Sequence, residues 1–215
     1  MKTTLHLLRI LSVSGLLVAL SPLAQADEHR GFYFNADLGG SWANNVSLKE
    51  FPDAPPGGKV ELTPGARLSL GGGFRACDWF RVGGEFGYGW NVFKDADGYL
   101  SQTPMMGVVE FHLPNRSKIV PFIGGGAGMS YNVIWFDNDS LGNGSRVDGA
   151  AGDTVFAWQA YGGLRYRINE SMSAGVVYKY LDTQASEWDV DNTSQDIRFG
   201  KIHLHSVSFS FSMSF

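Results

Sequence analysis

The chain has 215 residues, enough for one domain to close a single barrel or sandwich. Its hydrophobic share is 44%, yet its mean hydropathy of −0.09 is too low for a bundle of membrane helices. The formal net charge of −4 argues against a nucleic-acid partner, which would require clustered lysine and arginine.

The amino terminus has the three parts of a secretory signal peptide. Lys2 and Arg9 are basic, residues 10–20 are apolar, and residues 24–26 (Ala-Gln-Ala) have the small-x-small form of a cleavage site. A spanning helix would need roughly 20 apolar residues, about twice the length of this run. We therefore predict that residues 1–26 are a cleaved signal peptide and that residues 27–215 form one mature domain.

From residue 31 onward the dominant hydrophobic period is two, which is typical of strands with one apolar face. The pattern recurs in eight segments separated by turn-forming residues. These segments cover residues 32–42, 66–75, 80–92, 105–112, 118–136, 156–168, 172–180 and 206–215.

Short and long connections alternate between these segments. The short ones are residues 77–78, 114–117 and 169–171, and the long ones are residues 43–59, 94–102, 137–152 and 183–198. The long connections are rich in Gly, Asn, Asp and Pro, so we expect polar loops, and residues 137–152 and 183–198 show no apolar period to bury. Outer-membrane barrels have short periplasmic turns and longer extracellular loops. The pattern therefore predicts that both ends of the mature domain are periplasmic and that four loops face outward.

Many charged or titratable residues, Arg81 and His112 among them, alternate with the apolar ones, and this decides how the two faces are oriented. Burying so many charges in the core of a water-soluble protein would be prohibitive, whereas a polar lumen lets acids and bases pair. We predict an all-β, eight-stranded antiparallel up-and-down transmembrane β-barrel with its apolar face in lipid. The predicted lumen charge network consists of Asp37, Arg67, Glu85, Glu110, Arg165 and Lys179.

Three stretches carry a family resemblance. They are residues 121–128 (Pro-Phe-Ile-Gly-Gly-Gly-Ala-Gly), residues 161–166 (Tyr-Gly-Gly-Leu-Arg-Tyr), and the alternating terminal series Val207, Phe209, Phe211, Met213 and Phe215. The mature chain resembles the small eight-stranded outer-membrane barrels, including opacity-type surface antigens and the transmembrane domain of outer membrane protein A. The resemblance implies a Gram-negative outer membrane. It also implies that the terminal series is the signal read by the barrel assembly machinery.

Motifs for cofactors are weak. The glycine-rich residues 124–128 could suggest a phosphate loop, but such a loop must open a helix and this one continues into a strand pattern. The acidic residues of 137–148 imitate the spacing of a calcium loop, yet Leu141 occupies a ligand position and no helix pattern flanks it. We expect no cofactor and no metal.

A lipid A-modifying enzyme is a further alternative, because some small outer-membrane barrels pair His and Ser near the outer leaflet. His203, His205 and Ser206 lie toward the outer end of the last segment. Strand alternation points both histidines toward lipid and Ser206 into the lumen, so base and nucleophile diverge. We expect no catalytic residues.

Two non-enzymatic functions remain. An eight-stranded barrel has an interior just wide enough for side chains to fill, which favours a rigid barrel that displays its loops as a surface antigen or adhesin. The alternative is a narrow pore or lateral conduit for small solutes. The expected partners of the monomer are outer-membrane lipid, lipopolysaccharide, the barrel assembly machinery and a host or cell-surface ligand for the loops.

Overall fold

A computed structural model of the chain describes residues 31–44, 46–50, 59–94, 97–113, 115, 117–140, 146–188 and 197–215. The predicted signal peptide lies outside these residues. Within the described ranges, no helix is long and apolar enough to cross a membrane.

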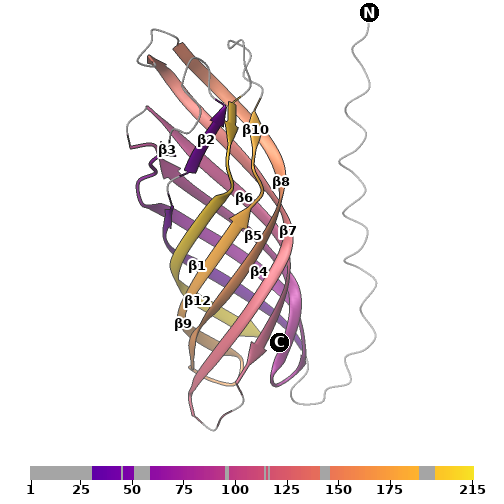
Figure 1. Ribbon diagram of the computed structural model, residues 1–215. Coiled ribbons are helices and arrows are strands. Elements are labelled where there is room, and N and C mark those ends of the chain that lie inside the picture. The colour runs from indigo at the N-terminus through magenta and orange to yellow at the C-terminus, as the bar shows by residue number, and fades with distance from the viewer. Residues whose placement is uncertain are drawn as a thin grey trace, which may run out of the picture.

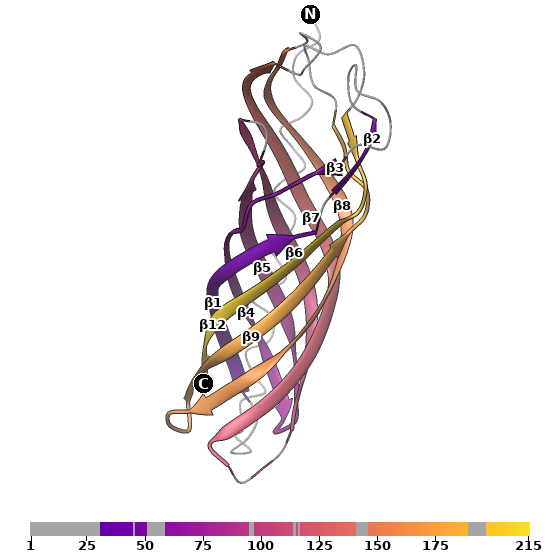
Figure 2. The ribbon, with the colours of Figure 1, turned by 60° about the vertical axis from the view of Figure 1, so that its left-hand side comes forward.

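Eight long antiparallel strands close into a barrel (Figures 1 and 2). They are β1 (Gly31–Ala43), β4 (Gly65–Cys77), β5 (Phe80–Val92), β6 (Gly98–His112), β7 (Ile119–Ser140), β8 (Arg146–Arg167), β9 (Met172–Thr183) and β12 (Ile202–Ser214). Each strand pairs with the next long strand along the chain, and β1 closes the barrel against β12 from Tyr33↔Ser214 to Ala43↔Leu204. Closure leaves no open edge in hydrocarbon. The predicted fold class is confirmed.

The period of two follows from the pleat, because successive side chains point to opposite faces of the sheet. Phe86 and Val176 point outward with 49% and 52% of their surface exposed, whereas Arg67 and Ser69 point inward with 2% and 3% exposed. Outward positions carry most of the large apolar side chains and inward positions carry the charges. The predicted orientation of the two faces is confirmed.

Placing a charge on the outward face should destabilise the barrel strongly. Phe86→Arg or Val176→Arg should lower the free energy of unfolding by about 2–4 kcal/mol, because the guanidinium would enter hydrocarbon near mid-membrane. Urea unfolding in lipid bilayers measures the loss. Ser69→Ala, on the inward face, is the control and should have a small effect. Equal losses from the two faces would contradict the orientation.

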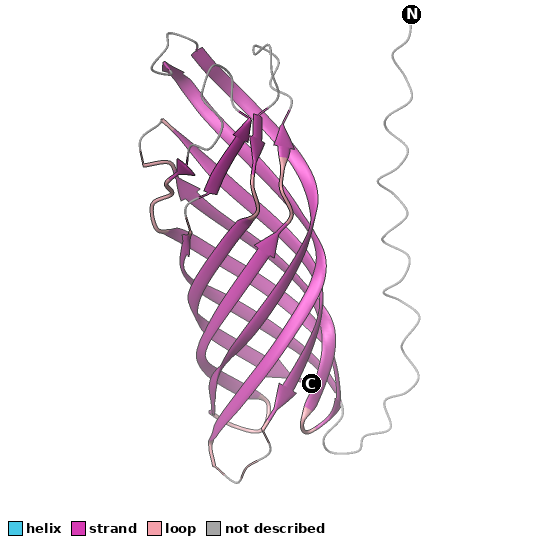
Figure 3. Ribbon diagram, in the orientation of Figure 1, coloured by secondary structure: helices cyan, strands magenta, loops and turns pink. Residues whose placement is uncertain are grey.

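Short turns join the strands at the rim that carries the carboxyl terminus, drawn at the lower end of Figure 3. The β8–β9 turn is closed by the side chain of Asn169, whose Oδ1 accepts hydrogen bonds from the amides of Ser171 and Met172 at 3.0 and 2.7 Å. The β6–β7 turn uses Asn115 in the same way, with its Oδ1 accepting from the amide of Ser117 at 3.0 Å. Asn is suited to such turns because its side chain replaces a backbone acceptor.

The opposite rim differs from the predicted polar loops. Strand β6 begins at Gly98, inside the predicted loop 94–102, and β7 and β8 extend to Ser140 and Arg146 through most of the predicted loop 137–152. Four shorter strands lie in the other two predicted loops, 43–59 and 183–198, and at their borders: β2 (Val46–Glu50), β3 (Lys59–Val60), β10 (Glu187–Trp188) and β11 (Ile197–Phe199). They form a separate sheet in the order β10-β11-β2-β3. Backbone pairing therefore continues well beyond the apolar pattern that marks the membrane.

Candidate functional site

Three layers of side chains fill the barrel, and the middle one is an ion-pair cluster. Lys179 Nζ lies 2.7 Å from Asp37 Oδ2 and 2.5 Å from Glu85 Oε2, which joins β9 to β1 and β5 across the lumen. Gln159 on β8 donates to the other oxygen of Glu85 at 3.1 Å. Arg67 is buried beside them and interacts electrostatically with both acids. This layer brings together four of the six residues predicted for the lumen network.

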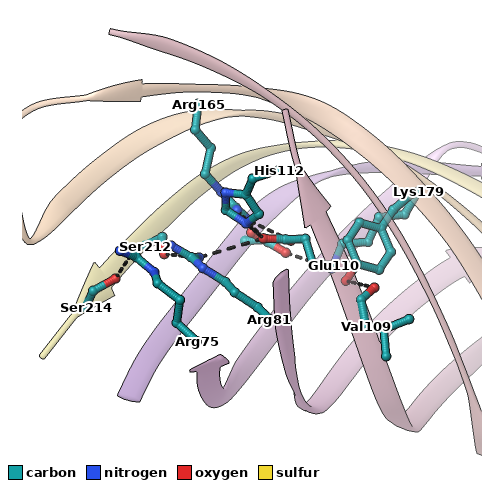
Figure 4. Close-up of polar contacts among 11 residues, drawn as sticks. Arg75, Arg81, Val109, Glu110, His112, Arg165, Lys179, Ser212 and Ser214 are labelled. Atoms are coloured by element: carbon teal, nitrogen blue, oxygen red, sulfur yellow. Dashed lines mark hydrogen bonds and ion pairs between the residues drawn. The ribbon is translucent and has the colours of Figure 1, made fainter. Parts of the chain in front are cut away.

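The second layer lies nearer the short-turn rim and centres on Glu110 (Figure 4). Arg165 donates from both Nη atoms to the two carboxylate oxygens, with Nη2 at 3.0 Å from Oε2. Arg81 Nη1 lies 3.7 Å and His112 Nε2 lies 2.6 Å from Glu110 Oε1. Such two-pronged pairing fixes both partners and satisfies charges that burial would otherwise penalise.

Sequence reasoning placed Arg81 and His112 on the lumen face but left them out of the network. Two aromatic residues of this layer, Tyr33 and Tyr161, were missed altogether. Tyr161 on β8 donates from its hydroxyl to the carbonyl of Val109 on β6 at 3.3 Å, across the intervening strand β7. Its ring lies where a side chain at Gly124 would be, since a Cβ there would fall 2.4 Å from the ring. The glycine that imitated a phosphate loop therefore makes room for a lumen tyrosine.

Apolar side chains also face the lumen and pack among the charged ones. The buried cluster consists of Met106, Val108, Phe122, Ala157, Tyr161, Val177, Leu181 and Leu204. The space left between this cluster and the ion pairs amounts to about 10 Å³, roughly the room for one water molecule.

A third layer covers the outer end of the barrel. It buries side chains from the short strands against those of the long ones: Val46, Phe93, Leu100, Ile134, Phe136, Trp188, Phe199 and Ile202. We call this layer, together with the sheet β10-β11-β2-β3, the extracellular cap. The rings of Trp188 and Phe199 meet edge to face at 4.9 Å. The prediction that residues 183–198 have nothing apolar to bury is wrong, because Trp188 is fully buried.

Polar contacts attach the cap to the barrel wall. Trp188 Nε1 donates to the carbonyl of Asn132 at 3.1 Å, and Asn132 Nδ2 donates to Ser186 Oγ at 3.0 Å. Beside β11, the amide of Gly200 donates to the carbonyl of Ser47 on β2 at 2.7 Å, which links the segment before β12 to the segment after β1. The cap therefore holds the segments after β1 and β9 in one defined arrangement.

An exposed ion pair lies beside the cap. Lys94 Nζ lies 2.7 Å from Glu61 Oε2, and this hydrogen bond holds the pKa of the Glu61 carboxyl below its usual value. A depressed carboxyl pKa contributes stability at neutral pH that is lost as the pH falls through the folded-state pKa. Because both groups are in water, the contribution is small.

The residues of the enzyme alternative are split between the two faces, as predicted. Ser206 is 1% exposed inside the lumen, while His203 and His205 face outward. Sequence reasoning missed that His203 has a carboxylate partner: its Nδ1 lies 2.8 Å from Asp182 Oδ2. Tyr178 and Tyr180 form hydrogen bonds with His205 and His203 at 2.7 and 2.9 Å. Among the described residues, no group of three His, Cys, Asp or Glu side chains is placed to hold a metal ion.

The predicted assembly signal lies on the outward face of β12, where Val207, Phe209 and Phe215 are exposed. The amide of Phe215 donates to the carbonyl of Phe32 at 2.8 Å, next to the β1–β12 closure. The terminal residues thus belong to the strand that closes the barrel against β1. Their role in assembly is a prediction that follows from the family resemblance.

Removing Phe215 should impair assembly in cells more than stability. Phe215→Ser should leave export intact but sharply lower the ratio of folded outer-membrane protein to degraded protein, while refolding into detergent stays near normal. If Phe215 were an ordinary lipid-facing side chain, its removal would cost only the burial of one aromatic side chain, about 1.5–3 kcal/mol of folding free energy. Phe32→Ser, an outward aromatic at the same rim, is the control. Equal losses in cells and in detergent would contradict a signal.

A closed antiparallel barrel with an apolar outer face and a charged, packed lumen defines a transmembrane β-barrel protein. The family model of the outer membrane protein beta-barrel domain matches residues 10–215, and the chain therefore belongs to this family. Membership confirms the resemblance inferred from the sequence and assigns the chain to the Gram-negative outer membrane. A search of the curated proteins found no significant match.

Two solved structures show how widely the fold is shared. Neisserial surface protein A is 18% identical over 87% of this chain and 100% of its own, with a TM-score of 0.55. Outer membrane protein OprG from Pseudomonas aeruginosa is 15% identical over 86% of this chain and 97% of its own, with a TM-score of 0.52. At these identities the likeness shows the fold alone.

Proposed function

We propose that this protein is a non-enzymatic display barrel whose extracellular cap is its binding surface. The observation that carries the proposal is the contrast between the packed lumen and the ordered sheet at the outer end of the barrel. Ion pairs and apolar side chains pack its interior, whereas segments that would otherwise be loops form a sheet with its own buried core. A preordered surface loses little entropy when it binds a partner.

The partner chemistry follows from location. Residues of the cap lie beyond the lipid-facing band, so they meet lipopolysaccharide sugars and the surfaces of other cells or of a host. A surface-antigen or adhesin role fits this position. Lipid surrounds the outward face, and the barrel assembly machinery meets the chain during insertion. We expect a monomer, because the membrane-spanning wall closes on itself and leaves no unpaired edge in lipid that another copy could extend.

Adhesion measurements test the proposal. Cells that produce the intact barrel should bind to immobilised host-cell surface or to lipopolysaccharide vesicles. Cells in which exposed side chains of the cap are removed, by Lys49→Ala, Lys59→Ala and Glu187→Ala together, should bind less. Ser69→Ala, which changes only the lumen, should bind like the unchanged protein. If the cap variant and the unchanged barrel bind equally, the cap is not the binding surface.

A further inference from the structure

The lumen opens at the periplasmic rim into a cavity of about 420 Å³. Four arginines line it: Arg75 on β4, Arg81 on β5, and Arg165 and Arg167 on β8. Arg81 and Arg165 are each 4% exposed and form its floor, while Arg75 is half-buried and Arg167 is exposed at the wall. The volume lies within the range of small-ligand pockets, about 300–1,000 Å³.

Positive charge exceeds negative charge in this layer, unlike the layer above it. In mid-barrel, Lys179 and Arg67 face Asp37 and Glu85, so the charges balance. At the cavity floor a single carboxylate, that of Glu110, serves both Arg81 and Arg165. At the rim, Asp78 interacts electrostatically with Arg75, and Glu170 is exposed to water. Together with Glu110 they make three carboxylates against the four arginines of the cavity.

Two of the arginines lie directly opposite each other on neighbouring strands. Arg75 pairs with Arg81 in the β4–β5 register, and like charges in that relation destabilise a sheet. Their guanidinium groups donate to neutral hydroxyls, Arg75 Nη2 to Ser214 Oγ at 2.9 Å and Arg81 Nη1 to Ser212 Oγ at 3.1 Å (Figure 4). A bound anion would offset the repulsion between the two guanidinium groups, whereas the neutral serine hydroxyls do not.

The floor guanidinium groups are held in place before any ligand arrives. Arg165 Cζ lies 3.8 Å from the ring centroid of Phe122, and Arg81 Cζ lies 4.9 Å from that of Tyr33. Planar guanidinium groups fixed on aromatic rings suit carboxylate and phosphate oxygens, which they bind through parallel hydrogen bonds. Fixed donors also lose little entropy on binding.

We propose that the periplasmic mouth of the barrel is a binding site for a small oxyanion that carries two or more carboxylate or phosphate charges. The ligand enters from the periplasm and contacts Arg75 and Arg167 at the wall and the Arg81 and Arg165 guanidinium groups below. This site is independent of the extracellular cap, so it does not depend on the proposed display function.

Titration calorimetry on the full barrel, refolded in zwitterionic detergent at low salt, tests the proposal. Pyrophosphate and succinate are the divalent or higher probes, and acetate is the monovalent comparison. Binding of either polyvalent probe, stronger than that of acetate and weakened by added salt, is the expected result. The tighter of the two identifies phosphate or carboxylate as the preferred group. Absence of binding by both polyvalent probes overturns the proposal.

Substitutions locate the site. The double variant Arg75→Gln with Arg167→Gln keeps the floor ion pairs and should weaken polyvalent binding about ten-fold or more, because two charged donors are lost. Arg198→Gln, at the extracellular end, removes the same charge elsewhere and should bind like the unchanged protein. Heat modifiability on unboiled gels checks that each variant is folded. Equal binding by the double variant and the unchanged barrel overturns the proposal.

Discussion

Glu110→Ala should lower the free energy of unfolding by about 3–5 kcal/mol, because it leaves buried guanidinium groups without their counterion. Glu110 is the carboxylate that both Arg165 and Arg81 contact, and all three side chains are almost completely buried. Glu110→Gln keeps the size and one acceptor oxygen but removes the charge, so its loss should be smaller. Urea unfolding in lipid bilayers measures both.

The matched control is a carboxylate with a similar partner in water. Glu187 pairs with Arg198 at the extracellular end, where the two side chains are 52% and 42% exposed. Glu187→Gln should therefore change the free energy of unfolding by no more than about 1 kcal/mol. If Glu110→Ala were as mild as this control, the lumen ion pairs would not hold the barrel together.

Trp188→Ala should release the extracellular cap while leaving the barrel closed. Trp188 is fully buried against Phe199 and donates to the carbonyl of Asn132, so the substitution leaves both a cavity and an unpaired carbonyl. Removing a buried tryptophan costs about 3–5 kcal/mol. That cost falls on the cap, because the lumen cluster and the β1–β12 closure do not involve this side chain.

Limited proteolysis of whole cells measures the release. The unchanged protein should resist cleavage near β10 and β11, Trp188→Ala should be cut there readily, and both should remain heat-modifiable. Trp188→Phe retains an aromatic ring in the cluster, so its resistance to cleavage should be intermediate between that of Trp188→Ala and that of the unchanged protein. Equal protease resistance of all three would show that the cap does not depend on this packing.

The membrane-spanning part of the fold could be predicted because a strand between lipid and a polar lumen must alternate apolar and polar residues. Alternation of Phe, Tyr and Leu with Arg, Glu and Ser indicates two faces with opposite solvents, and only a closed sheet satisfies the backbone in hydrocarbon. The Ser206–Phe215 stretch shows this pattern most clearly, and its predicted faces match β12.

This alternation is lost where both faces of a strand carry apolar side chains. Val177 and Leu181 point inward on β9, on either side of the outward Tyr178 and Tyr180, so the run has no clear alternation and the apolar side chains of the lumen were not predicted. Arg81 and His112 were placed on the right face, but alternation alone does not reveal which charges meet across the lumen.

The extracellular cap was missed for a different reason. Its strands have two to five residues, too few for a period, and their partners lie far away in sequence. Topology offered a signal nonetheless. Because β1 and β12 must be neighbours in a closed barrel, the segment after β1 and the segment before β12 emerge side by side. Trp188 lies inside the predicted loop 183–198 and Phe199 directly follows it, so apolar residues there could have pointed to a small second core.

Planar-bilayer conductance tests the central claim, that side chains close the lumen and the outer surface carries the function. The refolded barrel should give no steady single-channel current at neutral pH. Glu110→Ala combined with Lys179→Ala, which removes side chains from both ion-pair layers, should give measurable current if it folds, as judged by heat modifiability. Steady conductance by the unchanged barrel would contradict the account and identify the protein as a narrow pore.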